Sequence, residues 1–227
     1  MLNKIKKEIL NESDSKRAKI LQGFFKTGKG EYGEGDIFIG LTVPKSRDIA
    51  KKFFNLELKY VKELLNSKLH EERLIGLLIL VYNYPKDKKK IFEFYLENIN
   101  KINNWDLVDL TADKIVGDYL IDKDKDLLYK LVLSNNLWER RISIVSTFNF
   151  IKNNKFEDTL KISEILLKDK HDLIHKAVGW MLREVGKRDQ KVLEKFLLKH
   201  YKKMPRTMLR YAIERFDNSK REFYLKK

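Results

Sequence analysis

LIGLLILVYNY, residues 74–84, is the most apolar stretch of the chain, and its apolar residues follow the spacing of a helix. The same spacing recurs in DKIVGDYL (113–120), RISIVSTFNFI (141–151), TLKISEILL (159–167), VLEKFLL (192–198) and MLRYAIERF (208–216). No segment alternates apolar and polar residues over a comparable length, as a half-buried strand would. We therefore expect an all-α protein of about a dozen helices joined by short polar turns.

The helix starts recur at a regular interval. They lie near His70, Trp105, Trp138, His175 and Pro205, which gives steps of 35, 33, 37 and 30 residues. A period in the thirties with one helix pair per step is typical of a helical solenoid. The sequence thus predicts an α-α solenoid of HEAT-like repeats, a curved right-handed superhelix with a concave basic face.

The expected domain organisation follows from the same pattern. We predict a single HEAT-like repeat domain over residues 1–227. Amino-terminal helices and a glycine-rich loop would occupy 1–43, the repeats 44–217, and a carboxy-terminal tail 218–227.

Composition narrows the classes of function. The formal net charge of +15 favours a polyanionic partner, above all nucleic acid, although a lysine-rich composition from biased coding would give the same charge. With no cysteine, the chain has no disulfide, no thiolate zinc site and no thiol nucleophile. The longest apolar run, Leu74–Tyr82, is too short for a membrane helix, and the first residues lack the apolar centre of a signal peptide. We expect a soluble, cytoplasmic monomer, associated with the nucleoid when bound to DNA.

The segment Lys26–Asp36, KTGKGEYGEGD, cannot form a stable helix interior because it holds four of the ten glycines. Gly28, Gly30 and Gly33 satisfy the dinucleotide pattern G-x-G-x-x-G, and Gly23–Gly30 nearly matches a P-loop. Both motifs require a preceding strand within a βαβ unit, which this sequence does not predict. We expect instead a mobile loop, able to close over a ligand.

The histidines, His70, His171, His175 and His200, are scattered, and no Ser-His-Asp arrangement can be assembled from the sequence. His171 and His175 have the spacing of half a metal site on a helix but lack further committed ligands, so a surface or turn role is expected for them. The sequence predicts no metal and no cofactor.

Each tryptophan precedes a charged residue by three or four positions, which places ring and charge on one helical face. The pairs are Trp105 with Asp109, Trp138 with Arg141, and Trp180 with Arg183. Packing in the core is the ordinary role of tryptophan, but three such pairs on a basic chain favour a site. Asp113 is one turn beyond Asp109, whereas Asp106 points to another face. A carboxylate in a basic groove would repel phosphate, and it suits a reaction in which positive charge develops on a sugar. The structural alternative is a salt bridge from Asp109 to Arg141.

Four motifs together resemble the AlkD-type DNA alkylation repair proteins, the HEAT-like alkylpurine DNA glycosylases. They are FFKTGKGEYGEGD followed by GLTVPKSR (24–36 and 40–47), NNWDLVD (103–109), LWERR (137–141) and KAVGWMLREVGK (176–187). The resemblance runs from about Phe24 to Tyr211, nearly the whole chain.

This resemblance implies removal of 7-methylguanine, 3-methyladenine and related cationic purines from duplex DNA, without metal or cofactor. The carboxylate of the family falls on Asp109, its paired tryptophans on Trp105 and Trp180, and its phosphate-facing arginine on Arg141. In this family the lesion stays stacked rather than being flipped into a pocket. The basic residues expected to contact DNA are Arg140, Lys176, Arg183, Lys187, Arg206, Arg210 and Lys29.

Two other functions remain open at this stage. A non-catalytic HEAT-like module that binds DNA or an acidic protein would need the basic face but not Asp109. A repeat-code RNA reader would need small polar residues at the same position of every repeat, and the helix starts here carry different residues.

Overall fold

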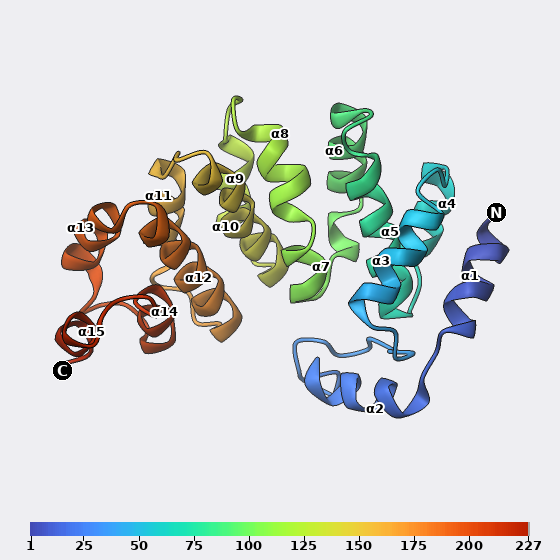
Figure 1. Ribbon diagram of the computed structural model, residues 1–227, viewed down its shortest axis with the longest axis horizontal. Helices are drawn as coiled ribbons and strands as arrows, with labels where there is room; N and C mark the ends of the chain where they lie inside the picture. Colours follow the sequence, from blue (N-terminus) through green and yellow to red (C-terminus); the bar gives the residue numbers. More distant parts are fainter. Residues whose placement is uncertain (227) are drawn as a thin grey trace. The chain divides into compact units, whose positions relative to one another are not determined.

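The computed structural model describes residues 1–226, which form helices and no strand; a single isolated bridge joins Ile37 to Leu69. The predicted all-α class is therefore confirmed for this part of the chain (Figure 1). By its contacts the chain separates into two compact units, Met1–Thr111 and Ala112–Lys227. Each unit has a central, largely buried helix of its own.

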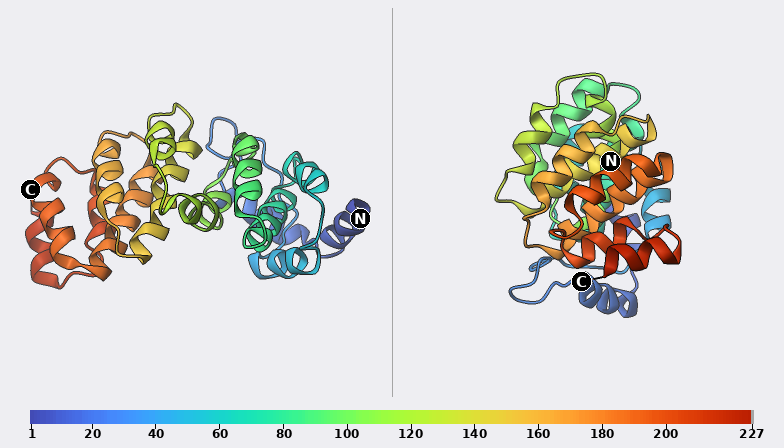
Figure 2. Two further views of the ribbon diagram at one scale, coloured as in Figure 1. Left: turned by 90° about the horizontal axis from the view of Figure 1, so that it is seen from above. Right: turned by 90° about the vertical axis from the view of Figure 1, so that its left-hand side faces the viewer.

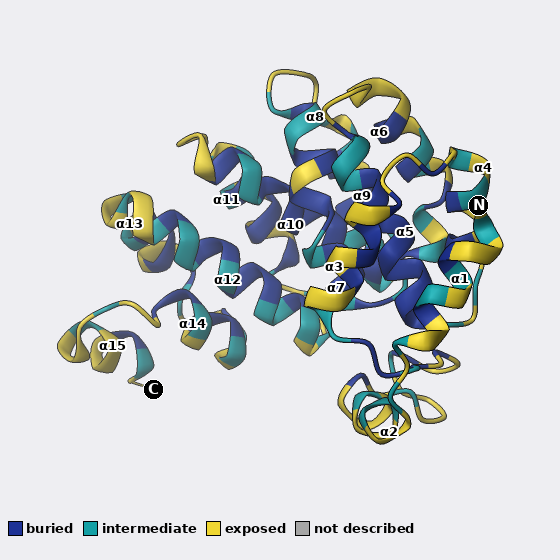
Figure 3. Ribbon diagram, turned by 45° about the vertical axis from the view of Figure 1, so that its right-hand side comes forward, coloured by how far each residue is buried: buried dark blue, intermediate teal, exposed yellow. Residues whose placement is uncertain are grey.

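The first unit is built around the segment that opened the sequence analysis. Its elements are α1 (Leu2–Asn11), α2 (Ser15–Phe24), α3 (Val43–Lys52), α4 (Leu58–Leu65), α5 (His70–Asn83), α6 (Lys88–Glu97), the 3-10 turn η1 (Ile99–Lys101) and α7 (Trp105–Asp109). Helices α3 and α4 both pack on α5, whose first eleven residues are all buried. By contrast α2 buries no residue at all (Figure 3).

The second unit consists of stacked helix pairs, which lie side by side in Figure 2. Its elements are the π-helical turn η2 (Asp113–Gly117), α8 (Asp118–Leu120), α9 (Asp126–Val132), α10 (Leu137–Lys152), α11 (Glu157–Leu166), α12 (Asp172–Arg188), α13 (Gln190–His200), α14 (Arg206–Ala212) and α15 (Asn218–Leu225). Helix α10 is the central element, packed by η2, α9, α11 and α12. Ten of its sixteen residues are buried, and these include Arg141, Ser143, Ser146 and Thr147 as well as apolar side chains.

Side-chain caps fix most helix starts. Asp14, Thr42, Asp87, Asp189 and Asp217 each accept a hydrogen bond from a backbone N–H in the first turn of the helix that follows. Such caps satisfy N–H groups that have no partner inside the helix. They explain why the helices begin at the polar breaks of the sequence.

Some boundaries differ from the expected ones. The helix expected to start near His175 begins at Asp172, because the His171 ring nitrogen accepts a hydrogen bond from the Leu173 N–H and caps it there. The segment expected to be a tail contains α15, in which Tyr224 is buried; residue 227 of that segment lies outside the described residues. No helix of the described chain is long and apolar enough to cross a membrane.

Gly179 allows close packing within the second unit. A Cβ atom there would lie 2.5 Å from the Met208 carbonyl oxygen and 2.5 Å from the Tyr211 Cβ, both on α14. Real Cβ atoms do not approach other atoms so closely, so any side chain would push α12 and α14 apart.

We therefore predict that Gly179→Ala destabilises the protein by about 1–3 kcal/mol through overpacking, which lowers the melting temperature by roughly 2–10 °C. Gly23→Ala in α2 is the matched control, since a Cβ there meets nothing within 4 Å. That variant should melt at or above the wild-type temperature, because alanine is the better helix former. Equal melting temperatures for the two variants would refute the packing account.

Candidate nucleic-acid interface and active site

The candidate site in the first unit is built on α7, a helix of only five residues. Trp105 is its first residue and Asp109 its last, and both side chains are half-buried. The residues between them, Asp106, Leu107 and Val108, are buried. A helix this short is not stable by itself, so its position depends on contacts with the rest of the unit.

The Trp105 ring is held in an aromatic cluster formed by Phe24, Phe25, Phe38, His70 and Trp105. Phe25 stacks almost parallel on Trp105, with centroids 5.0 Å apart and an interplanar angle of 6°. Phe25 also stacks on Phe38 at 4.7 Å, and Phe38 stacks on the His70 ring at 4.3 Å. Phe24, 62% exposed, meets Trp105 edge-on at 6.0 Å. Phe24 and Phe25, directly before the glycine-rich segment, thus support the tryptophan.

Beneath the rings lies a buried ion cluster of Asp36, His70, Arg73 and Asp106, each at most 6% exposed. His70 Nδ1 lies 3.0 Å from Asp36 Oδ2, and His70 Nε2 lies 2.8 Å from Asp106 Oδ2. Arg73 donates to Asp36 Oδ1 at 2.5 Å. Two carboxylates and one guanidinium leave a net charge of −1, which a protonated His70 neutralises.

Geometry and electrostatics agree on the charge state of His70. A neutral imidazole has one N–H, so one of its two contacts would oppose a lone pair to a carboxylate oxygen. Burial lowers the pKa of His70, but the charge and hydrogen bond of Asp106, with the hydrogen bond to Asp36, outweigh burial and raise it to about 9. Burial has the opposite effect on a carboxyl group and raises the pKa of Asp36. The hydrogen bond from His70 and the charge of Arg73 outweigh burial and bring the pKa of Asp36 below its ordinary value.

The glycine-rich segment is anchored rather than simply exposed. Its last residue, Asp36, is buried and accepts hydrogen bonds from Asn103 Nδ2 and Asn104 Nδ2 as well as from His70 and Arg73. Gly33 lies where a Cβ would be 2.4 Å from the Phe25 carbonyl oxygen. No strand precedes the segment within residues 1–226, so the setting that a nucleotide-binding glycine motif requires is absent from the described chain.

In the second unit, Trp180 lies half-buried on α12, with its ring 5.6 Å from that of Phe148. Trp138, in contrast, is 8% exposed and belongs to the core. Trp138 therefore has the ordinary role of a tryptophan, which is packing in the core. Asp113 is also buried, paired with Lys114 at 3.0 Å and Lys152 at 2.7 Å. Asp113, which the spacing places one turn beyond Asp109, is therefore held in ion pairs within the second unit.

The arginines after Trp138 are tied into the second unit. Arg141 is 5% exposed and donates from Nη1 to the Leu173 carbonyl at the start of α12. Arg140 donates to Asp169 at 2.7 Å and to the carbonyls of Ser134 and Asn135. These bonds join the start of α10 to neighbouring turns.

The other basic residues expected to contact DNA differ in how firmly they are held. Lys176 pairs with Asp172 at 2.7 Å, Lys187 with Glu184 at 2.7 Å, and Arg183 with Glu214. Arg206 donates to the Leu225 carbonyl at 3.0 Å. Arg210 and Lys29 are exposed, and neither side chain has a hydrogen bond or ion pair with any residue of 1–226. Among the basic residues expected to contact DNA, these two cations are the most available to an external anion.

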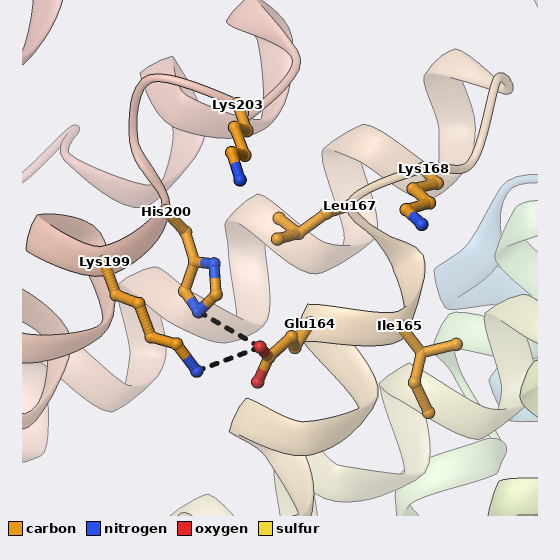
Figure 4. Close-up of a pocket in the computed structure, with 7 residues that line it drawn as sticks. All are labelled: Glu164, Ile165, Leu167, Lys168, Lys199, His200 and Lys203. Atoms are coloured by element: carbon orange, nitrogen blue, oxygen red, sulfur yellow. Dashed lines mark hydrogen bonds and ion pairs between the residues drawn. The ribbon is translucent and has the colours of Figure 1, made fainter.

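Figure 4 shows a separate pocket of about 700 Å³ between α11 and α13. It is lined by Glu164, Ile165, Leu167, Lys168, Lys199, His200 and Lys203. Glu164 accepts from Lys199 at 3.0 Å and lies 3.6 Å from His200 Nε2. A pocket for a flipped base holds it by stacking between rings or apolar side chains. This lining is mostly cationic and aliphatic, and it contains no residue expected at the site.

Sequence reasoning placed Trp105 and Asp109 on one short helix but missed His70, Asp36 and Asp106 as its supports. Asp106 was expected only to point elsewhere, and it points into the core. The available signal was HEER (70–73), a histidine and three charged residues directly before the most apolar run of the chain. His171 and His175 fill the expected turn roles, since His175 Nε2 bonds the Asp169 carbonyl at 2.6 Å.

Comparison with known proteins identifies the family. The family model described as DNA alkylation repair enzyme matches residues 5–216. The chain belongs to the DNA alkylation repair enzyme family. No curated protein matches it.

Solved structures of this family's helical-repeat type share the fold. A predicted DNA alkylation repair enzyme from Enterococcus faecalis is 14% identical, with a TM-score of 0.72 over 91% of this chain and 98% of that one. AlkD2 from Streptococcus mutans is 18% identical, with a TM-score of 0.60 over 89% of this chain and 98% of that one. At these identities the similarity concerns the fold alone.

The ion cluster gives a pH prediction for stability. The pKa of His70 is about 9 in the folded protein, against 6.5 for an ordinary histidine, so the folded state binds the proton more tightly. The resulting contribution, about 3 kcal/mol, is fully present below about pH 6.5 and is lost as the pH rises through about 9. Denaturant unfolding at a series of pH values should show this loss.

Titration of the histidine ring nitrogens by nuclear magnetic resonance provides the direct check. Burial lowers the pKa values of His171 and His200, so these rings should lose their protons below pH 6.5, well before His70. A His70 signal that titrates at or below 6.5 would show that the ring is neutral between its two carboxylates.

Proposed function

We propose that this member of the DNA alkylation repair enzyme family is a monofunctional DNA glycosylase that excises cationic alkylated purines, such as 7-methylguanine and 3-methyladenine, from duplex DNA. The observation that carries the proposal is the placement of Asp109 one turn beyond Trp105 on a helix braced by the aromatic cluster and the ion cluster. A carboxylate held beside an aromatic ring suits a sugar that gains positive charge.

The chemistry requires little from the protein. A purine that carries a positive charge is already a good leaving group, so no general acid has to protonate it. As the glycosidic bond breaks, its electron pair leaves with the base, and the sugar becomes an oxocarbenium-like cation. Water then adds to the anomeric carbon, and the water's proton goes to a base, for which Asp109 is our candidate.

Magnitudes support the assignment of Asp109. A carboxylate about 4 Å from the developing cation stabilises it by roughly 4 kcal/mol at an effective dielectric constant of about 20. That energy corresponds to about a thousandfold in rate. Trp105 and Trp180 would shelter the sugar and add cation–π attraction of roughly 0.5–2 kcal/mol. Arg141 would be the phosphate-facing arginine, as the family resemblance implies. The damaged base would stay stacked in the duplex.

The net charge of +15 supports duplex DNA as the partner. Arg210 and Lys29 are our first candidates for phosphate contacts, because DNA would not have to displace an internal partner from either. Arg140 is a weaker candidate, since three internal acceptors already hold its guanidinium. We propose a cytoplasmic monomer that acts on DNA without a metal.

The role of Asp109 predicts a specific kinetic defect. In Asp109→Asn the shape is kept and the charge is lost, so single-turnover release of 7-methylguanine should fall by roughly a hundredfold or more. Duplex affinity should hold or rise, because an anion has been removed from a site for a polyanion. Asp124→Asn is the matched control: it loses the same charge in an exposed turn and should release base at the wild-type rate.

If Asp109 is only structural, the variant should melt earlier and lose activity only with the folded fraction. A well-folded Asp109→Asn protein with unchanged base release would favour a non-catalytic module that binds DNA or an acidic protein.

The phosphate contacts predict a graded salt dependence. Removing one contact reduces the slope of log affinity against log salt by about 0.9. Arg210→Gln and Lys29→Gln should each show this reduction for undamaged duplex, whereas Arg140→Gln should change the slope much less. A duplex affinity that does not depend on salt would exclude a phosphate-binding surface altogether.

A further inference from the structure

One buried histidine joins three segments that are far apart in the sequence. His70 opens α5; its Nδ1 faces Asp36 at the end of the glycine-rich segment, and its Nε2 faces Asp106 in α7. Asp36 also accepts from Asn104 Nδ2 at 3.3 Å, and Asn104 Oδ1 accepts from the Trp105 N–H at 2.9 Å. Trp105 therefore lies between two residues, Asn104 and Asp106, that are both tied to the ion cluster.

The rings form a second connection between the same segments. Phe38 stacks on His70 with an interplanar angle of 22°, and Phe25 packs on both Phe38 and Trp105. The histidine is thus connected to the tryptophan by two routes. One is a chain of hydrogen bonds through Asp36 and Asn104 to the Trp105 N–H, and the other is the series of packed rings. A five-residue helix is not stable by itself, so its orientation depends on contacts such as these together with the burial of Leu107 and Val108.

We propose that His70 is a positioning residue, which as an imidazolium between Asp36 and Asp106 fixes α7 so that Trp105 and Asp109 meet the damaged nucleotide in the reactive geometry. This inference rests on the proposed glycosylase function for its kinetic consequence only. It assigns no contact between His70 and DNA, since the ring is 1% exposed.

Histidine suits this place for a reason of geometry. A protonated imidazole donates from two nitrogens on opposite sides of a flat ring, so it bridges two carboxylates while its face stacks on Phe38. A glutamine has one donor nitrogen and no flat ring, and a lysine has no ring. The charged groups that face the imidazole are Asp36 from the glycine-rich segment, Arg73 from α5 and Asp106 from α7.

The kinetic consequence is a loss of rate rather than of binding. A displacement of about 1 Å at a reacting group can cost on the order of a hundredfold in rate. For His70→Gln we expect single-turnover base release to fall by roughly ten- to a hundredfold. Affinity for undamaged duplex should stay within about threefold, because the phosphate-binding cations are elsewhere.

The direct experiment observes Trp105 in the protein without DNA. The chain has three tryptophans, so 5-fluorotryptophan labelling gives three fluorine resonances, and Trp105→Phe identifies the one from Trp105. In His70→Gln the Trp105 resonance should shift or broaden, while those of Trp138 and Trp180 stay in place. His200→Gln is the control, because it makes the same substitution at a largely buried histidine in the second unit; it should leave the Trp105 resonance unchanged.

A second variant keeps the test decisive if His70→Gln fails to fold. His70→Gln removes one cation from a balanced cluster, whereas His70→Gln with Asp106→Asn leaves Asp36 and Arg73 as a neutral pair. The double variant should therefore fold better than His70→Gln while α7 still lacks its attachment. Its Trp105 resonance should be displaced and its base release slow.

Titration of the wild-type protein separates positioning from mere stability. The Trp105 resonance should move toward its position in His70→Gln as the pH rises through about 9, the pKa of His70, and neither His70 variant should show this transition. A Trp105 resonance at the wild-type position in a folded His70 variant would overturn the proposal, as would wild-type base release by that variant. If the wild-type protein releases no base, the proposed function fails, and the fluorine spectra still decide the role of His70.

Discussion

The first unit depends on one interaction, the His70 imidazolium held between the carboxylates of Asp36 and Asp106. The ion cluster is buried, so its charges must balance, and they balance only when His70 carries a proton. The hydrogen bonds of His70 hold the end of the glycine-rich segment and the start of α7 against the start of α5. The aromatic cluster is built on the same ring, and it holds the tryptophan that the family resemblance assigns to the site.

The glycine-rich segment and the residues directly before it support the short helix α7. Phe24 and Phe25, directly before that segment, pack against Trp105, and Asp36, its last residue, accepts a hydrogen bond from Asn104 beside Trp105. Asp109 is left at the end of α7, half-buried and one turn from the supported ring. A carboxylate on a helix fixed in this way needs little reorganisation when charge develops on a substrate, which supports the role proposed for Asp109.

The helices were predictable from sequence because apolar spacing and polar capping are local signals, as in LIGLLILVYNY and at Asp87 or Asp189. Trp105 and Asp109 could be placed on one face by spacing alone. The support beneath them could not, because Asp36, His70 and Asp106 are 34 and 36 residues apart and meet only in the folded unit. For the same reason, spacing alone could not distinguish Trp138, which is buried in the core, from the half-buried Trp180. Nor could it show that Asp113 forms ion pairs with Lys114 and Lys152.

The central claim is that this family member breaks the glycosidic bond of a cationic purine. Its most direct test is to incubate the wild-type protein, without added metal, with duplex DNA that contains 7-methylguanine, and to measure the free base. The account predicts stoichiometric release of 7-methylguanine under single-turnover conditions, leaving an abasic site in an intact strand. Tight binding of the duplex with no base released above the spontaneous rate would contradict it and identify the protein as a binding module.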